Sequence, residues 1–190
     1  MKSTVMIFLA VVFLFPMAVL ANDDGDTQVF VSLHKWSTVL SEGNSKSVRL
    51  GSDILRGVGI GIPLNDTFTV NSEFLFGDPA TTVTPGTNNT AEMMMFNLSL
   101  DTKIRRADWH NGDISPFINV GLGAMEFNQE TTNGIDEWDM SYSLGAGINW
   151  DMGGGNTFLK FYYRWFWVDM DVTNSMELFD GVSFAFGMAF

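Results

Sequence analysis

Large apolar and small residues alternate along the last ten positions of this chain. In residues 181–190, Val182, Phe184, Phe186, Met188 and Phe190 are separated by glycine, serine and alanine. Successive side chains of a strand point to opposite faces, so one face is bulky and apolar and the other is thin. The thin face carries no charge. The pattern predicts a wall with large residues facing lipid and small residues facing a crowded lumen.

Seven further segments alternate in the same way, and turn-rich stretches separate them. An even number of strands lets an antiparallel barrel return both ends to one side. The predicted fold is therefore all-β, an eight-stranded antiparallel up-and-down transmembrane β-barrel. The alternative is a soluble sandwich with the large residues in its core. The predicted strands are residues 27–36, 54–62, 67–76, 93–101, 117–125, 140–150, 157–168 and 179–190.

The connections alternate in length, as expected for such a barrel. Residues 38–53, 77–92, 126–139 and 169–178 are mostly long and polar and predict outer loops, whereas residues 63–66 and 151–156 predict tight periplasmic turns. The connection 102–115 is long where a short turn is expected. We interpret it as an extended hairpin with an interfacial Trp109, and a basic contact for a periplasmic partner is the alternative.

The first 21 residues have the features of a secretory signal. Lys2 is their only charge, an apolar stretch of about fifteen residues follows, and Ala21 precedes the polar Asn22. That stretch is short for a spanning helix, which is the alternative. We therefore expect a cleaved signal peptide, residues 1–21, and one barrel domain, residues 22–190.

Composition narrows the class of function. Cysteine is absent, so disulfides, thiolate metal sites and a cysteine nucleophile are excluded. The formal net charge of −12 argues against nucleic-acid binding, which requires clustered Lys and Arg. The acidic residues within 136–139 and 169–171 match no established calcium loop, and we expect no metal and no cofactor.

Four stretches resemble the outer-membrane barrel family that includes the OmpA transmembrane domain, OmpX and the opacity adhesins. They are residues 116–123, 143–149, 161–164 and 181–190, rich in glycine and aromatic residues. The resemblance covers nearly the whole mature chain and implies location in the bacterial outer membrane. It also implies that Phe190 belongs to the signal read by the barrel assembly machinery, and that no carboxyl-terminal peptidoglycan-binding domain follows.

Charged residues fall at lumen-facing positions. The strands that carry Glu73 and Arg164 lie four apart in an eight-strand ring and therefore face each other. We expect a Glu73–Arg164 pair across the lumen near mid-height. The structural interpretation is a polar plug, and the functional alternative is a gate that exchanges partners and passes small ions. The remaining candidates for this lumen network are Lys160, Asp101, Asn97, Asn119 and His34.

Acyl-transfer chemistry needs a nucleophile, a base and an orienting acid within reach of one another. His34 faces the predicted lumen, His110 lies in a periplasmic connection, and the outward Ser72 has no histidine in a compatible register. We therefore expect His34 to be a hydrogen-bonding partner and the protein not to be an enzyme.

Lys35 and Arg56 fall in the outward register near the outer ends of adjacent predicted strands. There they would meet lipopolysaccharide phosphates, unless local distortion moves them into loops. The expected function is structural support of the outer membrane or contact of the outer loops with a surface protein or host ligand. The alternatives are a narrow ion channel or carrier of small hydrophobic molecules and, third, a lipid A-modifying enzyme.

Overall fold

A computed structural model describes residues 27–190, except 43–45, 51–53, 79, 84–86, 105–106, 110–111, 130–137, 153–155 and 171–174. The predicted signal peptide lies outside the described residues. The described strands are β1 (Gln28–Glu42), β2 (Lys46–Leu50), β3 (Ile54–Pro63), β4 (Phe68–Gly77), β5 (Ala80–Val83), β6 (Thr87–Lys103), β7 (Ala107–Trp109), β8 (Gly112–Gln129), β9 (Trp138–Met152), β10 (Thr157–Met170) and β11 (Ser175–Ala189).

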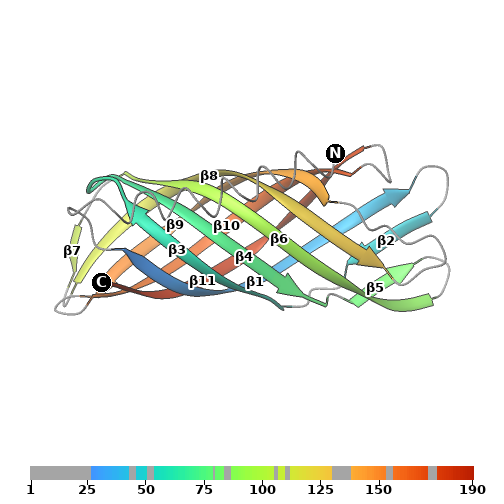
Figure 1. The fold of residues 1–190 in the computed structure, drawn as a ribbon, viewed down its shortest axis with the longest axis horizontal. Helices are drawn as coiled ribbons and strands as arrows, with labels where there is room; N and C mark the ends of the chain where they lie inside the picture. The colour runs from blue at the N-terminus through green and yellow to red at the C-terminus, as the bar shows by residue number, and fades with distance from the viewer. Residues whose placement is uncertain are drawn as a thin grey trace.

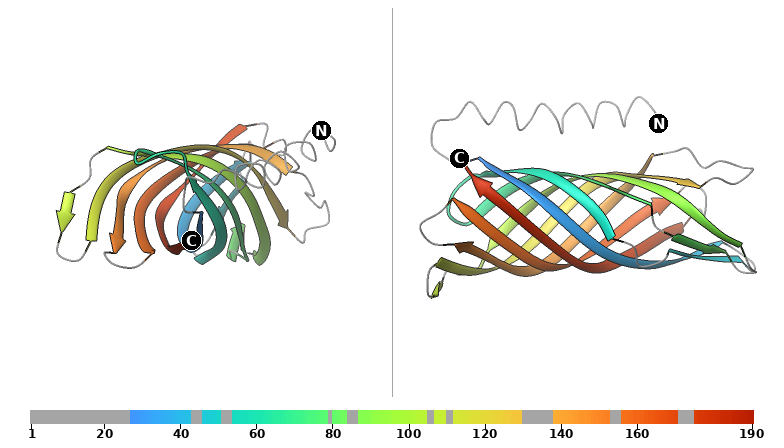
Figure 2. Two further views of the ribbon diagram at one scale, coloured as in Figure 1. Left: turned by 60° about the vertical axis from the view of Figure 1, so that its left-hand side comes forward. Right: turned by 90° about the horizontal axis from the view of Figure 1, so that it is seen from below.

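Eight of these strands close into one antiparallel barrel (Figures 1 and 2). The ring runs β1, β3, β4, β6, β8, β9, β10, β11 and returns to β1, with β6 paired directly to β8. The pairing that joins the first and last strands, which we call the seam, extends from Gln28↔Ala189 to Ser37↔Asp180. The predicted fold is confirmed.

Both ends of the described chain lie at one end of the barrel, which we call the near end. The Phe190 amide donates to the Thr27 carbonyl oxygen at 2.9 Å. Here β3 turns into β4, and Asn65 Oδ1 accepts hydrogen bonds from the Thr67 and Phe68 amides, each at 2.9 Å. The predicted hairpin within residues 102–115 is also at this end, as β7 paired with the start of β8.

The wall is taller at the opposite, far end than the sequence pattern predicts. Much of 38–53 and 77–92, predicted as loops, is strand: β2 pairs with β1 and β5, and β5 pairs with β6. Strands β2 and β5 thus continue the wall above β3 and β4. The prediction was wrong there because a wall with water outside needs no apolar face, so the alternation that identifies the other strands is lost.

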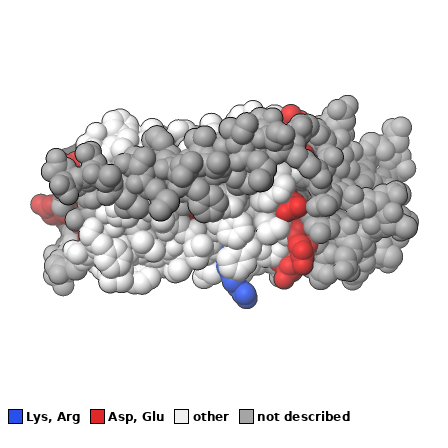
Figure 3. All heavy atoms as spheres, in the orientation of Figure 1, with Lys and Arg blue, Asp and Glu red and all other residues white. Residues whose placement is uncertain are grey.

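The outer surface of the closed ring is apolar. Phe184 and Phe186 are each 40% exposed, and Val31 is 56% exposed. Figure 3 shows this uncharged belt between two margins of acidic side chains, with one cationic side chain projecting from it. A surface of this extent matches a lipid-facing wall rather than a soluble one. In the part of the chain that the structure describes, no helix is long and apolar enough to cross a membrane.

The lumen is filled with side chains in three layers. A mainly aromatic cluster fills the near end and a larger apolar cluster fills the far end, with polar residues between them. The thin lumen face predicted for residues 181–190 is confirmed, and other strands supply the large residues that point inward at both ends. The near cluster is Phe30, Phe117, Phe158, Tyr162 and Ala185; the far cluster is Trp36, Leu55, Leu75, Met93, Met95, Met125, Phe166, Val168 and Phe179.

Glycines permit close approach of neighbouring strands in this wall. A Cβ placed on Gly181, in the seam, would overlap the Lys35 carbonyl oxygen and lie 2.8 Å from the Trp36 Cα. Both obstacles are backbone atoms of β1, which cannot move without breaking the ladder.

We therefore expect Gly181→Ala to destabilise the barrel by about 1–3 kcal/mol through overpacking. Urea unfolding in lipid vesicles, followed by tryptophan fluorescence, measures this. Val182→Leu is the matched control because Val182 faces outward, 41% exposed. Equal stabilities of the two variants would contradict the packing argument.

Candidate functional site: the polar layer of the lumen

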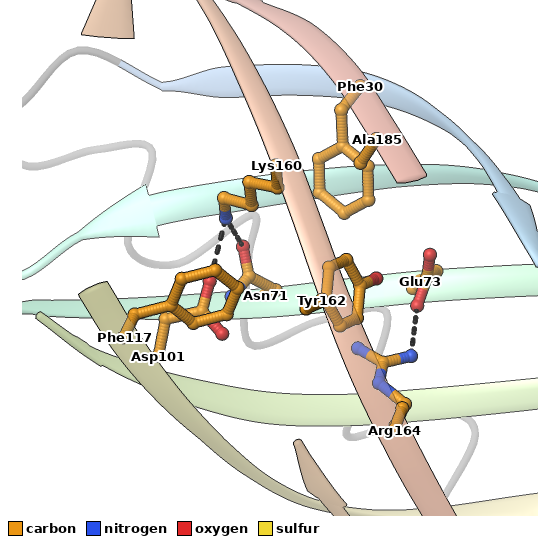
Figure 4. A pocket seen from close by; sticks show the side chains of 9 residues that line it. All are labelled: Phe30, Asn71, Glu73, Asp101, Phe117, Lys160, Tyr162, Arg164 and Ala185. Carbon is orange, nitrogen blue, oxygen red and sulfur yellow. Dashed lines mark hydrogen bonds and ion pairs between the residues drawn. The ribbon is translucent and has the colours of Figure 1, made fainter. Parts of the chain in front are cut away.

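A buried ion pair crosses the middle of the lumen. Arg164 on β10 donates through Nη1 to Glu73 Oε2 on β4 at 2.8 Å. The side chains are 4% and 2% exposed, and Figure 4 shows them reaching toward each other from opposite walls. Two charges removed from water need this mutual compensation, because the loss of either leaves the other without a counter-charge.

The second oxygen of Glu73 joins the pair to β1. Ser32 Oγ donates to Glu73 Oε1 at 2.6 Å, and His34 Nε2 lies 3.1 Å from the same oxygen. His34 Nδ1 lies 2.7 Å from Ser183 Oγ on β11. These contacts join β1, β4, β10 and β11. We call Glu73, Arg164, Ser32, His34 and Ser183 the upper network.

A second ion pair lies toward the near end. Lys160 Nζ donates to Asp101 Oδ2 at 2.7 Å and approaches Asn71 Oδ1 at 3.4 Å. Asn119 Nδ2 donates to Asp101 Oδ1 at 2.6 Å. These contacts join β4, β6, β8 and β10, and we call this set the lower network.

Aromatic rings surround both cations. The Lys160 ammonium lies 5.3 Å from the centroid of Phe158 and 5.7 Å from that of Phe30. The Arg164 guanidinium carbon lies 4.9 Å from the Tyr162 ring centroid and 5.2 Å from that of Phe166. Ring faces attract cations and exclude water, so they strengthen the two pairs while closing the lumen around them.

A cavity of about 10 Å³ remains between the networks. That volume is about the space of one water molecule. Figure 4 shows Lys160 pointing to Asp101 and Asn71 on one side of Tyr162, and Arg164 pointing to Glu73 on the other. The lining residues are Phe30, Asn71, Glu73, Asp101, Phe117, Lys160, Tyr162, Arg164 and Ala185.

The structure divides the single network proposed from the sequence. Asp101 and Asn119 bind Lys160 rather than supplementing the Glu73–Arg164 pair. Asn97 Oδ1 accepts from Ser143 Oγ at 3.2 Å, although Asn97 is directly opposite Glu73 in the register. Pairing on neighbouring strands therefore does not decide which polar groups bond to each other across the lumen.

Ser32, Ser183, Asn71 and Tyr162 were not singled out from the sequence. All four occupy lumen-facing positions, so the period-two register already contained the signal. Their partners were not predictable from it, because the period identifies a face but not which strands bring two side chains to the same height.

The outward candidates also have definite places. Lys35 and Arg56 are exposed and lie within strands β1 and β3, so the distortion alternative is excluded. Phe190 follows β11 directly and is 69% exposed. Among the described residues, no group of three or more His, Cys, Asp or Glu side chains could hold a metal ion.

Two solved structures have the same fold. Neisserial surface protein A is 12% identical, with a TM-score of 0.57, and the match covers 87% of this chain and 97% of that one. The N-terminal β-barrel domain of Pseudomonas aeruginosa OprF is 11% identical, with a TM-score of 0.50, covering 87% and 100%. No family model and no curated protein matches the sequence.

At these identities the likeness establishes the fold, which is that of eight-stranded outer-membrane barrels. This fold and the apolar belt agree with the outer-membrane location that the sequence predicts.

We expect Glu73→Gln or Arg164→Met alone to destabilise the barrel by about 3–5 kcal/mol, because each leaves a buried charge unpaired. The double variant should lose less than the sum of the two. A double-mutant cycle of urea unfolding measures the coupling.

Lys103→Gln is the control. Its pair with Asp151 spans 3.2 Å, but the side chains are 24% and 36% exposed. A pair that water reaches contributes about 0–1 kcal/mol. Losses as small in Glu73→Gln as in Lys103→Gln would contradict the assigned role of the crossing pair.

Proposed function

We propose that this protein is a closed structural barrel of the bacterial outer membrane whose far-end hairpins make contacts outside the cell. The observation that carries the proposal is the filled lumen: among the described residues, two ion-paired networks lie between two apolar clusters, and the cavity between the networks is the size of one water molecule. The interior of an eight-stranded barrel is narrow enough for side chains to fill it, as they do in the described part of this lumen.

The far end supplies the surface for contact. There β1, β2, β5 and β6 rise as paired strands beyond the short strands β3 and β4. Hairpins braced by hydrogen bonds can present polar residues to a partner without a large ordering cost on binding. A surface protein or host ligand at these hairpins is the proposed external partner.

The near end fits the periplasmic side. Its described turns are tight and both ends of the described chain meet there, as an even-stranded barrel requires. On this orientation the exposed Phe190 is available to the barrel assembly machinery, and the belt contacts membrane lipid and lipopolysaccharide. The predicted signal peptide would take the chain through the periplasm.

A narrow ion channel is the second candidate. Its support is that both ion pairs line one cavity, so Glu73 and Asp101 lie near both Lys160 and Arg164. An exchange of partners would shift charge within the lumen. The far apolar cluster gives weaker support to a carrier of small hydrophobic molecules, because its side chains are fully packed.

We propose that the protein is not an enzyme. Ser183, His34 and Glu73 form a chain with spacings of 2.7 and 3.1 Å, which is the order of a nucleophile, a base and an acid. All three side chains, however, are at most 2% exposed. A lipid A acyl group on the outer wall cannot reach them, so their hydrogen bonds serve the plug.

In planar bilayers we expect the full chain to give no reproducible current steps, because buried ion pairs and aromatic side chains fill the described middle of the lumen. Replacing Glu73, Lys160 and Arg164 together with serine should open a leak, and Lys103→Gln should not. Reproducible steps in the unchanged protein that disappear in Arg164→Gln would favour the gate instead.

Replacing residues 80–90 with Asn-Gly removes β5 and the paired start of β6. We expect cells with this variant to lose most attachment to solid or host surfaces while the outer membrane holds the same amount of folded barrel, because the ring pairing of β4 with Met93–Thr102 remains. Replacing residues 105–111 with Asn-Gly, at the near end, is the control. Unchanged attachment in the first variant would contradict an external role for this hairpin.

A further inference from the structure

Two cationic side chains stand in the apolar belt. On β1, Lys35 follows the exposed Val31 and Leu33 in the outward register; on β3, Arg56 lies between the exposed Ile54 and Val58. Cations on a lipid-facing wall are destabilising unless they reach the headgroup region or meet an anion.

The register brings the two cations together. Lys35 pairs with Ile54 and Leu33 pairs with Arg56, so Lys35 and Arg56 occupy diagonal positions on the same face of neighbouring strands. Diagonal neighbours are about 7–8 Å apart, within reach of one anion for side chains of this length.

Neither cation forms an ion pair with a carboxylate within the described part of the chain. Two outward carboxylates are diagonal neighbours by register: Asp180 of Lys35, and Asp78, two residues after Phe76, of Arg56. Asp180 accepts a hydrogen bond from Tyr163 Oη at 2.7 Å. Lys35 and Arg56 therefore present donors outward that the described residues leave available to an anion.

The surroundings place this pair at the outer margin of the belt. Lys35 is paired across the seam with Val182, which is paired in turn with Tyr163 on β10. In the next row of outward residues toward the far end, Asp180 is paired with Trp165. The Tyr163 and Trp165 rings contact each other, with centroids 4.9 Å apart. Tyrosine, tryptophan and an aspartate together mark the membrane interface. The seam ends in that second row, at Ser37↔Asp180.

We propose that Lys35 and Arg56 form a binding site for a phosphate of lipid A in the outer leaflet. The guanidinium donates two parallel hydrogen bonds to phosphate oxygens, and the ammonium adds a point charge from the diagonal position. The apolar neighbours Leu33 and Val58 lie beneath the acyl chains of the same lipid. Lipid A is the outer-leaflet lipid that supplies phosphate at this height.

The inference rests on the proposed outer-membrane orientation, and a test with purified protein separates the two. The full chain, folded in detergent micelles, is titrated with lipid A, and the apparent dissociation constant is read from tryptophan fluorescence. The same titration uses lipid A without phosphates and phosphatidylglycerol. If cell fractionation placed the protein in another membrane, the proposed function would fail whatever the titration gave.

We expect Lys35→Gln with Arg56→Gln to weaken binding of lipid A by at least about tenfold. Lys103→Gln, which removes a cation at the near end, should change it by less than about twofold. Phosphate-free lipid A should bind the unchanged protein as weakly as lipid A binds the double variant. Arg56→Lys should restore only part of the affinity, because lysine lacks the planar fork.

Three results would overturn the site. The first is equal affinity of the unchanged protein and the double variant for lipid A. The second is an equal loss in Lys103→Gln, which would indicate attraction by net charge alone. The third is phosphatidylglycerol binding as tightly as lipid A with the same dependence on Lys35 and Arg56, which would show a general anionic-lipid contact. Lys35 and Arg56 are exposed and Lys103 is partly exposed, and retention of the heat-modifiable folded band verifies the barrel in each variant.

Discussion

The structure depends on one constraint: charges enclosed by an apolar wall must neutralise one another inside it. The central layer meets this constraint with two cations, Lys160 and Arg164, and two anions, Glu73 and Asp101, in two separate pairs. In a medium of low dielectric constant each pair is strong only while both members are present. Residues from opposite walls are thereby held at fixed distances, and the ring keeps its cross-section.

Packing and polarity cooperate in this arrangement. The aromatic cluster at the near end and the methionine-containing cluster at the far end shield the two networks from water on both sides. Where a large ring enters the lumen, a glycine stands opposite, as Gly59 does against Phe30 and Gly187 against Phe158. The small residues of the wall thus make room for the large ones, and the lumen is filled without widening the barrel.

The alternation of residues predicted the fold because lipid outside and a packed lumen inside impose different chemistry on successive positions. That same period placed Lys160 and Arg164 inward on β10, even though large apolar and aromatic residues occupy both faces of that strand around Arg164. Ring position then predicted the pairing of Glu73 with Arg164.

Other features were outside the reach of the pattern. β2, β5 and the outer parts of β1 and β6 lie beyond the apolar belt, where no lipid requires an apolar residue at every second position, so they lacked a signal. The division into upper and lower networks depends on stagger between strands, which decides whether Asp101 meets Lys160 or Arg164. Stagger arises from the closed geometry of the ring and is not written in any one segment.

The seam between β1 and β11 has a consequence for biogenesis. It joins residues about as far apart as the sequence allows, and the His34–Ser183 contact alone spans 149 positions. No part of the ring can shut before the final strand has been made, so the contacts that complete the wall are the least local in the molecule and the slowest to nucleate. Until then the chain has two unpaired strand edges and an exposed apolar surface, and such a species is prone to aggregation. The unfolded chain must therefore reach the bilayer faster than it associates with other copies. The rate of this delivery, rather than the stability of the finished barrel, then limits the yield of folded protein.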